Sequence, residues 1–259
     1  MSAPVFYPTA DLSGVAAGGR FRLDGPEGRH AATVRRIGSG ETVEVCDGDG
    51  RRLTCVVVGV GRDALELSVR SVTIEPAPAP VLELVQALAK GDRDLQAIET
   101  ATELGVDVVV PWQADRSIVR WHADRAAKAA GKWESTLRAA AQQSRRARIP
   151  RLAGLTGTRA LAARIAAGTA DGSLAAVVLH EDAAAPLGAV LAESVGADGP
   201  ARVLVIVGPE GGIGPDELGA LTGAGARTAV LGPHVLRSST AGPAAIALAS
   251  VQLGRWPAA

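Results

Sequence analysis

The chain has 259 residues, with 27 Lys and Arg against 27 Asp and Glu, so its formal net charge is zero. The length allows one large or two modest domains with a packed core, and the charge balance argues against a uniformly basic nucleic-acid binder. Two cysteines cannot form a disulfide scaffold, no apolar run could span a bilayer, and the first ten residues lack a secretion signal. A cytoplasmic globular protein without membrane contact is therefore expected.

Short alternating or β-branched runs dominate the N-terminal part of the chain. Turn residues such as Gly48-Asp49-Gly50 separate these runs. Runs of this length between Asp and Gly turns are typical of a small barrel or sandwich. Residues 1–74 are therefore predicted to form a small β domain, with strands at 20–24, 41–47, 53–60 and 64–72.

Residues 75–80 (EPAPAP) form the clearest linker, because three alternating prolines favour an extended backbone. Strand and helix patterns then alternate, which predicts βαβ units and a parallel sheet over 81–259. The expected strands are 81–88, 106–110, 174–179, 203–207 and 228–231. The expected helices are 92–105, 122–148, 158–167, 186–195, 215–222 and 239–254. The fold class is therefore α/β, with a β domain in front.

Three strand ends carry unusual residues, at 179–182 (LHED), 207–215 (VGPEGGIGP) and 231–240 (LGPHVLRSST). Ligands of open parallel sheets bind beyond the carboxyl ends of the strands. The glycines of the second loop let backbone amides approach a ligand, but their spacing matches neither the dinucleotide nor the P-loop pattern. A tight turn without any ligand remains an alternative for each loop taken alone.

The segments GPEGGIGPDEL (208–218) and LGPHVLRSSTA (231–241), in this order, resemble the bacterial 16S ribosomal RNA (uracil-N3)-methyltransferase family of the SPOUT superfamily. Further matches are Lys90-Gly91-Asp92, Glu103-Leu104-Gly105, Arg116-Ser117 and Gln142-Gln143-Ser144-Arg145, so the resemblance covers essentially the whole chain. It implies a PUA-like β-barrel RNA-binding domain, then a parallel-sheet domain with a deep trefoil knot. It also implies an S-adenosylmethionine cofactor, 16S rRNA of the 30S subunit as partner, and a homodimer formed through the knotted domains.

The resemblance places the cofactor against the three strand ends. Apolar walls and backbone amides suit its adenosine and methionine moieties. The residues expected to bind it are Leu179, Glu181, Val207, Gly208, Glu210, Gly211, Leu231, Gly232, Leu236, Ser238 and Ala241. No metal is expected, because the four histidines are scattered without ligand spacing.

Methyl transfer to uracil N3 requires loss of the N3 proton and stabilisation of negative charge on O2 and O4. Arg237 is the expected catalytic cation, since a fixed positive charge stabilises that anion. Glu210 is the carboxylate within the loop motifs; it is a candidate general base, with bracing of the glycine-rich loop as the alternative role. The family commonly has Glu where this chain has Ser239, so any role of that carboxylate does not transfer.

Residues 116–151 contain ten basic and two acidic residues, which predicts phosphate attachment, with a solvated helix face as the alternative. The expected RNA-binding residues are Arg20, Arg22, Arg29, Arg116, Arg138, Gln142, Arg145 and Arg146. In the first domain, His30, Arg35 and Arg36 are further candidates. Two other functions stay open: a related RNA methyltransferase acting on a ribose 2′-hydroxyl or another base, and a non-catalytic RNA-binding assembly protein.

Overall fold

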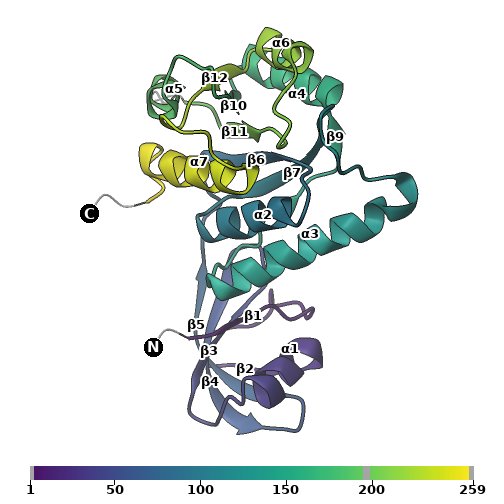
Figure 1. Cartoon of the computed structure of the whole chain (residues 1–259). Coiled ribbons are helices and arrows are strands. Elements are labelled where there is room, and N and C mark those ends of the chain that lie inside the picture. Colours follow the sequence, from purple (N-terminus) through teal and green to yellow (C-terminus); the bar gives the residue numbers. More distant parts are fainter. Residues whose placement is uncertain (1–2, 195–198, 257–259) are drawn as a thin grey trace. The chain divides into compact units, whose positions relative to one another are not determined.

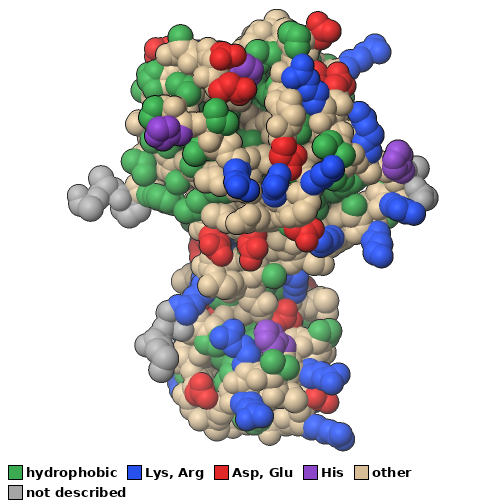
Figure 2. Space-filling model, viewed as in Figure 1, with side chains coloured by type: hydrophobic (Ala, Val, Ile, Leu, Met, Phe, Trp, Pro, Cys, Tyr) green, Lys and Arg blue, Asp and Glu red, His purple; other side chains and the backbone are tan. Residues whose placement is uncertain are grey.

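The computed structural model describes residues 3–194 and 199–256, and it divides the chain into two compact units (Figure 1). Unit 1 comprises residues 1–77 and 141–149, and unit 2 comprises 78–140 and 150–259. The chain ends and the end of the expected 186–195 helix lie outside the described residues. Acidic and basic side chains are interspersed over the face shown in Figure 2, in keeping with the zero net charge.

Unit 1 is a five-stranded sheet in the order β1-β3-β4-β5-β2, antiparallel except for the β1–β3 pair. Alternate residues of β3, β4 and β5 are buried, and they form one apolar core. Its elements are β1 (Val5–Phe6), β2 (Arg20–Leu23), helix α1 (Gly25–Arg29), π-helix η1 (His30–Val34), β3 (Thr42–Cys46), β4 (Arg51–Val60) and β5 (Leu65–Ile74). The four predicted strands are confirmed, whereas β1, α1 and η1 carried no clear pattern in the sequence.

Unit 2 is a parallel seven-stranded sheet in the order β12-β10-β11-β6-β7-β8, with β9 also on β7. Its strands are β6 (Val81–Ala87), β7 (Val108–Gln113), β8 (Arg151–Leu152), β9 (Thr156–Gly157), β10 (Leu174–Leu179), β11 (Arg202–Val207) and β12 (Arg227–Ala229). The predicted parallel sheet is thus confirmed, and its strands β7, β10 and β11 are largely apolar because helices cover both faces.

The helices of unit 2 are α2 (Arg93–Glu103), α3 (Ala123–Gln143), α4 (Thr158–Ala170), α5 (Leu187–Ser194), α6 (Pro215–Gly223) and α7 (Ser238–Gln252). Helices α4 and α6 share an apolar core with one face of the sheet, and α7 contacts both α2 and α5 at the other face (Figure 1). Every described helix is too short or too polar to cross a bilayer.

Helix α3 ends earlier than the predicted 122–148 helix, and residues 141–149 belong to unit 1 rather than to the domain expected over 81–259. Arg145 has a left-handed backbone (φ 59°), and the Arg146 amide donates to the Ala141 carbonyl at 3.0 Å. This hydrogen-bond pattern terminates a helix. Within unit 1, the Gln142 side chain donates to the Val5 carbonyl at 2.9 Å and to Glu27.

Candidate cofactor and catalytic site

The three predicted loops converge because β10, β11 and β12 are neighbouring parallel strands whose carboxyl ends meet at one edge. Together with Arg93 and Ala241 they enclose a cavity of about 390 Å³. That size falls in the range of small-molecule sites. Ten of the eleven residues predicted to bind the cofactor line this cavity: Leu179, Glu181, Val207, Gly208, Glu210, Leu231, Gly232, Leu236, Ser238 and Ala241.

Gly211 is the exception, because it faces Arg116 instead of the cavity. A Cβ atom on Gly211 would lie 3.3 Å from the Arg116 Cβ. The Arg116 guanidinium also donates a hydrogen bond of 3.2 Å to the Gly211 carbonyl. Arg116, predicted to bind RNA, therefore contacts the glycine-rich loop.

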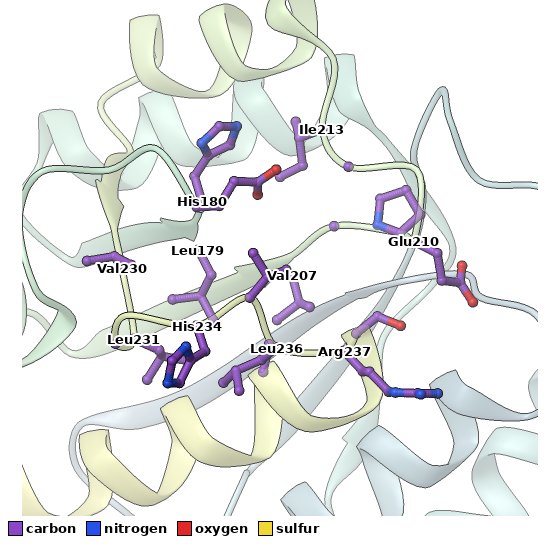
Figure 3. Close-up of a pocket in the computed structure, with 18 of the residues that line it drawn as sticks. Leu179, His180, Val207, Glu210, Ile213, Val230, Leu231, His234, Leu236 and Arg237 are labelled. Carbon is purple, nitrogen blue, oxygen red and sulfur yellow. The ribbon is translucent and has the colours of Figure 1, made fainter.

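One end of the cavity is apolar. Figure 3 shows Leu179, Val207, Leu231 and Leu236 gathered there. Gly208 packs tightly against Ile213, since a Cβ on Gly208 would lie only 2.6 Å from the Ile213 Cγ1. This end suits a flat, largely apolar group such as a nucleoside base.

The other end is polar and holds Glu210 and Arg237 on one side of the cavity (Figure 3). Glu210 is engaged: its Oε1 accepts hydrogen bonds from the Arg93 guanidinium at 2.9 Å and from the Lys90 amide at 3.2 Å. Arg93 lines the cavity and was not among the residues predicted from the sequence. These contacts tie the glycine-rich loop to the start of α2.

Arg237 differs from Glu210 because its guanidinium is exposed and, among the described residues, has no acidic partner within 4.0 Å. Its backbone forms the N-cap of α7, where its carbonyl accepts hydrogen bonds from the amides of Thr240 (2.8 Å) and Ala241 (2.9 Å). The anchored backbone thus presents an uncompensated cation at the polar end of the cavity.

Ser238 lines the cavity and is only 7% exposed, yet its Oγ has no hydrogen-bond partner within residues 3–194 and 199–256. A buried hydroxyl without a partner is costly, and such groups call for a ligand or an ordered water. Its neighbour Ser239 is also buried, at 8% exposed. The Nδ1 atom of His180 accepts a hydrogen bond from the Asp182 amide at 3.2 Å, so this ring nitrogen is engaged within its own loop.

The predicted RNA-binding residues are divided between the two units. Arg116 and Arg138 belong to unit 2, whereas Gln142, Arg145 and Arg146 belong to unit 1. The predicted helix 122–148 would have carried Arg138, Arg145 and Arg146 together, but α3 ends at Gln143, so only Arg138 of the three lies on it. Among the described residues no group of three or more His, Cys, Asp and Glu side chains is arranged to hold a metal ion.

Arg20 and Arg22 lie on β2, the edge strand at the end of the first sheet away from β1, and Arg29 lies on α1. Arg22 is neutralised by Glu66 at 2.5 Å and by Asp24 at 3.5 Å. Its exposed guanidinium is therefore less available to phosphate than the sequence suggested.

The chain combines a small β domain with an α/β domain that has a cavity at the ends of its parallel strands, and both parts match known families. The RNA methyltransferase domain family matches residues 75–250, and the RNA methyltransferase PUA domain family matches residues 23–70. The chain belongs to this RNA methyltransferase family.

Three proteins that are similar to this chain carry the same name within the family. Ribosomal RNA small subunit methyltransferase E of Mycobacterium bovis is 44% identical over 100% of this chain and 95% of that protein. The Bacillus subtilis protein of the same name is 30% identical over 90% of each chain. A crystal structure of the Neisseria gonorrhoeae enzyme of that name, bound to S-adenosyl methionine, superposes with a TM-score of 0.80 at 26% identity, covering 96% of this chain and 98% of that one.

Proposed function

We propose that this protein methylates N3 of a specific uridine in 16S rRNA of the 30S subunit, using S-adenosylmethionine. Family membership supports RNA methyl transfer, and the names of the relatives support the small subunit as substrate. The observation that carries the proposal is that, among the residues that the structure describes, the Arg237 guanidinium has no acidic partner and lies beside a cavity whose buried Ser238 hydroxyl has no hydrogen-bond partner. Activity on ribosomal subunits would place the protein in the cytoplasm.

The cavity fits the cofactor by its chemistry. Leu179, Leu231 and Leu236 would hold the adenosine, and the Ser238 hydroxyl would hydrogen-bond to a polar atom of the methionine moiety. The exposed carboxylate of Glu181 at the cavity wall favours a cationic sulfonium ligand. When bound, S-adenosylmethionine supplies an electrophilic methyl group.

Arg237 is assigned the stabilisation of negative charge on the uracil carbonyl oxygens as N3 loses its proton. A guanidinium without a carboxylate partner can direct its donors at a developing anion. The backbone of Arg237 is held at the start of α7, so the cation is positioned before the substrate arrives. Correct placement of the uracil contributes further to the rate.

Glu210 is assigned the bracing of the glycine-rich loop through Arg93 and the Lys90 amide. The Oε1 atom of Glu210 already accepts two hydrogen bonds from the protein, so this oxygen is directed at α2 rather than at a substrate. The role of general base remains the alternative for Glu210, and the two roles make different kinetic predictions.

We further propose that the loops after β10, β11 and β12 form a trefoil knot, and that two copies associate through this domain. The family resemblance supports both statements, and the convergence of the three loops at one cavity is compatible with them. Arg20, Arg29, Arg116 and Arg138 remain proposed contacts to RNA phosphates.

The test is methyl transfer from tritiated S-adenosylmethionine to 30S subunits isolated from cells that lack the enzyme. Incorporation of a single methyl group into 16S rRNA is expected. Cofactor binding by calorimetry without incorporation would instead support a non-catalytic RNA-binding protein, the alternative that Ser239 in place of Glu keeps open.

A further inference from the structure

Glu217 is a buried carboxyl group beside the glycine-rich loop. It lies in the first turn of α6, directly after residues 208–214, and the residue is only 3% exposed. Its Oε1 accepts hydrogen bonds from the Asp115 amide at 3.0 Å and from the Thr158 hydroxyl at 2.5 Å. The Thr158 oxygen in turn accepts the indole N–H of Trp112 at 3.1 Å. The turn after β7, the start of α4 and the start of α6 therefore meet at one carboxylate oxygen.

The stability of the fold does not explain why a carboxyl group occupies this position. The second oxygen of Glu217, Oε2, is buried and has no hydrogen-bond partner in the described part of the chain. Within the same residues no side-chain nitrogen of Lys, Arg or His lies within 4.0 Å of it, whereas the buried Glu83 is paired with Arg164 and Arg202 at 2.5 Å each. A buried carboxylate without a cation is costly. Residues that carry such a cost concentrate at functional sites.

The turn that Glu217 holds carries Arg116. This residue directly follows Asp115, and its guanidinium donates a hydrogen bond of 3.2 Å to the Gly211 carbonyl. The glycine-rich loop also packs along the Arg116 side chain. A Cβ atom on any of three glycines would approach Arg116 closely: Gly211 (3.3 Å), Gly214 (3.7 Å) and Gly212 (3.9 Å). Arg116 therefore supports one side of the loop.

The other side of the glycine-rich loop faces the cofactor cavity, where Glu210 and Ile213 lie on its wall (Figure 3). Glu217 acts on both supports of this loop. It belongs to the helix that begins where the loop ends, and it holds the turn from which Arg116 reaches the loop. A shift of that turn would move Arg116, and the cavity wall would move with it.

We propose that Glu217 is a positioning residue for methyl transfer, which acts through Arg116. It fixes the turn after β7 against α6, so that Arg116 holds the glycine-rich loop in its cofactor-binding shape before S-adenosylmethionine arrives. A preorganised site binds more tightly because fewer groups must be ordered on binding. The inference rests on the proposed function in one respect, because it requires S-adenosylmethionine to bind in this cavity.

The experiment measures S-adenosylmethionine affinity of full-length variants by calorimetry without RNA, and their stability by denaturant unfolding. Glu217→Ala removes both hydrogen bonds, whereas Glu217→Gln removes the charge and keeps an acceptor oxygen. Asp216→Ala is the matched control, since it removes an exposed acid from the same turn of α6. Arg255→Ala is the stability control, because it breaks a largely buried ion pair with Asp107 at the amino end of β7.

Glu217→Ala is expected to weaken cofactor binding about tenfold, whereas Glu217→Gln and Asp216→Ala stay within about twofold. The KM for S-adenosylmethionine rises in parallel, and kcat at saturating cofactor stays within about threefold because Arg237 lies outside this network. Arg255→Ala lowers the stability of the fold and leaves cofactor affinity unchanged.

A double-mutant cycle provides the measurement that a merely structural role would not affect. Arg116→Ala alone is expected to weaken cofactor binding about tenfold, and adding Glu217→Ala should weaken it by less than about twofold more, since the two residues act as a unit. Thr158→Val removes one donor to Glu217, with Thr158→Ser as its control, and tests the same network if Glu217→Ala does not fold. It is expected to weaken binding about threefold.

Unchanged cofactor affinity in Glu217→Ala or, if that variant does not fold, in Thr158→Val would overturn this inference. Additive losses in the cycle, or an equal loss in Arg255→Ala, would overturn it as well, because the effect would then reflect general destabilisation. An unaltered protein that binds S-adenosylmethionine but transfers no methyl group would contradict the proposed function and leave the role of Glu217 in cofactor binding intact. The two failures are therefore distinguishable.

Discussion

Arg93 and Glu210, which are 117 positions apart in the sequence, form an ion pair of 2.9 Å at the polar end of the cofactor cavity. The same Glu210 oxygen accepts the Lys90 amide. These contacts hold the start of α2 against the glycine-rich loop after β11. Lys90 and Arg93 come from the first segment and Glu210 from the second.

Glu210→Gln and Arg93→Ala therefore test whether the carboxylate braces the loop. Each variant removes the partly exposed ion pair, which contributes about 0.5–1 kcal/mol, so both are expected to weaken S-adenosylmethionine binding about threefold. A general base would behave differently: kcat would fall by about 10²–10⁴ in Glu210→Gln alone. Calorimetry and single-turnover kinetics separate the two.

The matched control for the variants Glu210→Gln and Arg93→Ala is Lys132→Ala. It removes another ion pair of the same unit, between Lys132 and Asp92 at 2.8 Å, in which both side chains are well exposed. No measurable change in cofactor affinity is expected. A loss as large as in Arg93→Ala would mean that charge in general, rather than the Glu210 contact, controls binding.

Ser238→Ala is expected to weaken cofactor binding without weakening the fold. The hydroxyl has no partner in the described part of the chain, so its removal leaves the free energy of unfolding equal or slightly higher, whereas a lost ligand hydrogen bond costs about 1 kcal/mol. Denaturant unfolding and calorimetry measure the two effects. A drop in stability with unchanged cofactor affinity would show that the hydroxyl acts within the fold.

Gly208→Ala is expected to lower cofactor affinity at least about tenfold, because the new Cβ displaces Ile213 into the cavity. Ile213→Ala added to it should restore part of the loss, since the two side chains share one space. Gly219→Ala, where nothing lies within 4 Å of the new Cβ, is the control. Additive losses in the double variant would contradict the packing argument.

The two thiols of unit 1 give a pH prediction. Burial raises the pKa of Cys46 to about 12 and that of Cys55 to about 11, from 9.0. Because the folded-state pKa lies above the unfolded value, the stabilisation is present below pH 9 and is lost as the pH rises towards 11–12. Denaturant unfolding at pH 8 and pH 10 should show this fall, and a Cys46→Ala/Cys55→Ala double variant should show less of it. An equal fall in both proteins would refute the assignment.

Helix ends illustrate what the sequence could and could not predict. Helix α2 ends at Glu103, and Gly105 follows its C-cap Leu104 with a φ of 102° that is natural for glycine, so this end was predictable. Helix α3 uses the same hydrogen-bond pattern with Arg145 at the left-handed position. No glycine marks that end, and the helical pattern runs on to Pro150, so tertiary contacts within unit 1 decide where the helix stops.

The cavity proposed to bind the cofactor could be located from the sequence, because parallel strands place the loops after them at one edge of the sheet. Arg93 was not, since its position depends on the order of the strands. Strand β6 pairs with β11, with Gln86 opposite Val207, and this brings the start of α2 beside the glycine-rich loop. The periodicity of a strand does not specify which other strand pairs with it in a parallel sheet.

Nucleoside mass spectrometry of 16S rRNA tests the central assignment most directly. Unmodified 30S subunits are incubated with S-adenosylmethionine and either the unaltered protein or Arg237→Ala. The unaltered protein should produce 3-methyluridine, and Arg237→Ala should produce it at least about 10²-fold more slowly, with cofactor affinity preserved. Absence of 3-methyluridine, a 2′-O-methylated nucleoside in its place, or undiminished turnover by Arg237→Ala would contradict the assignment.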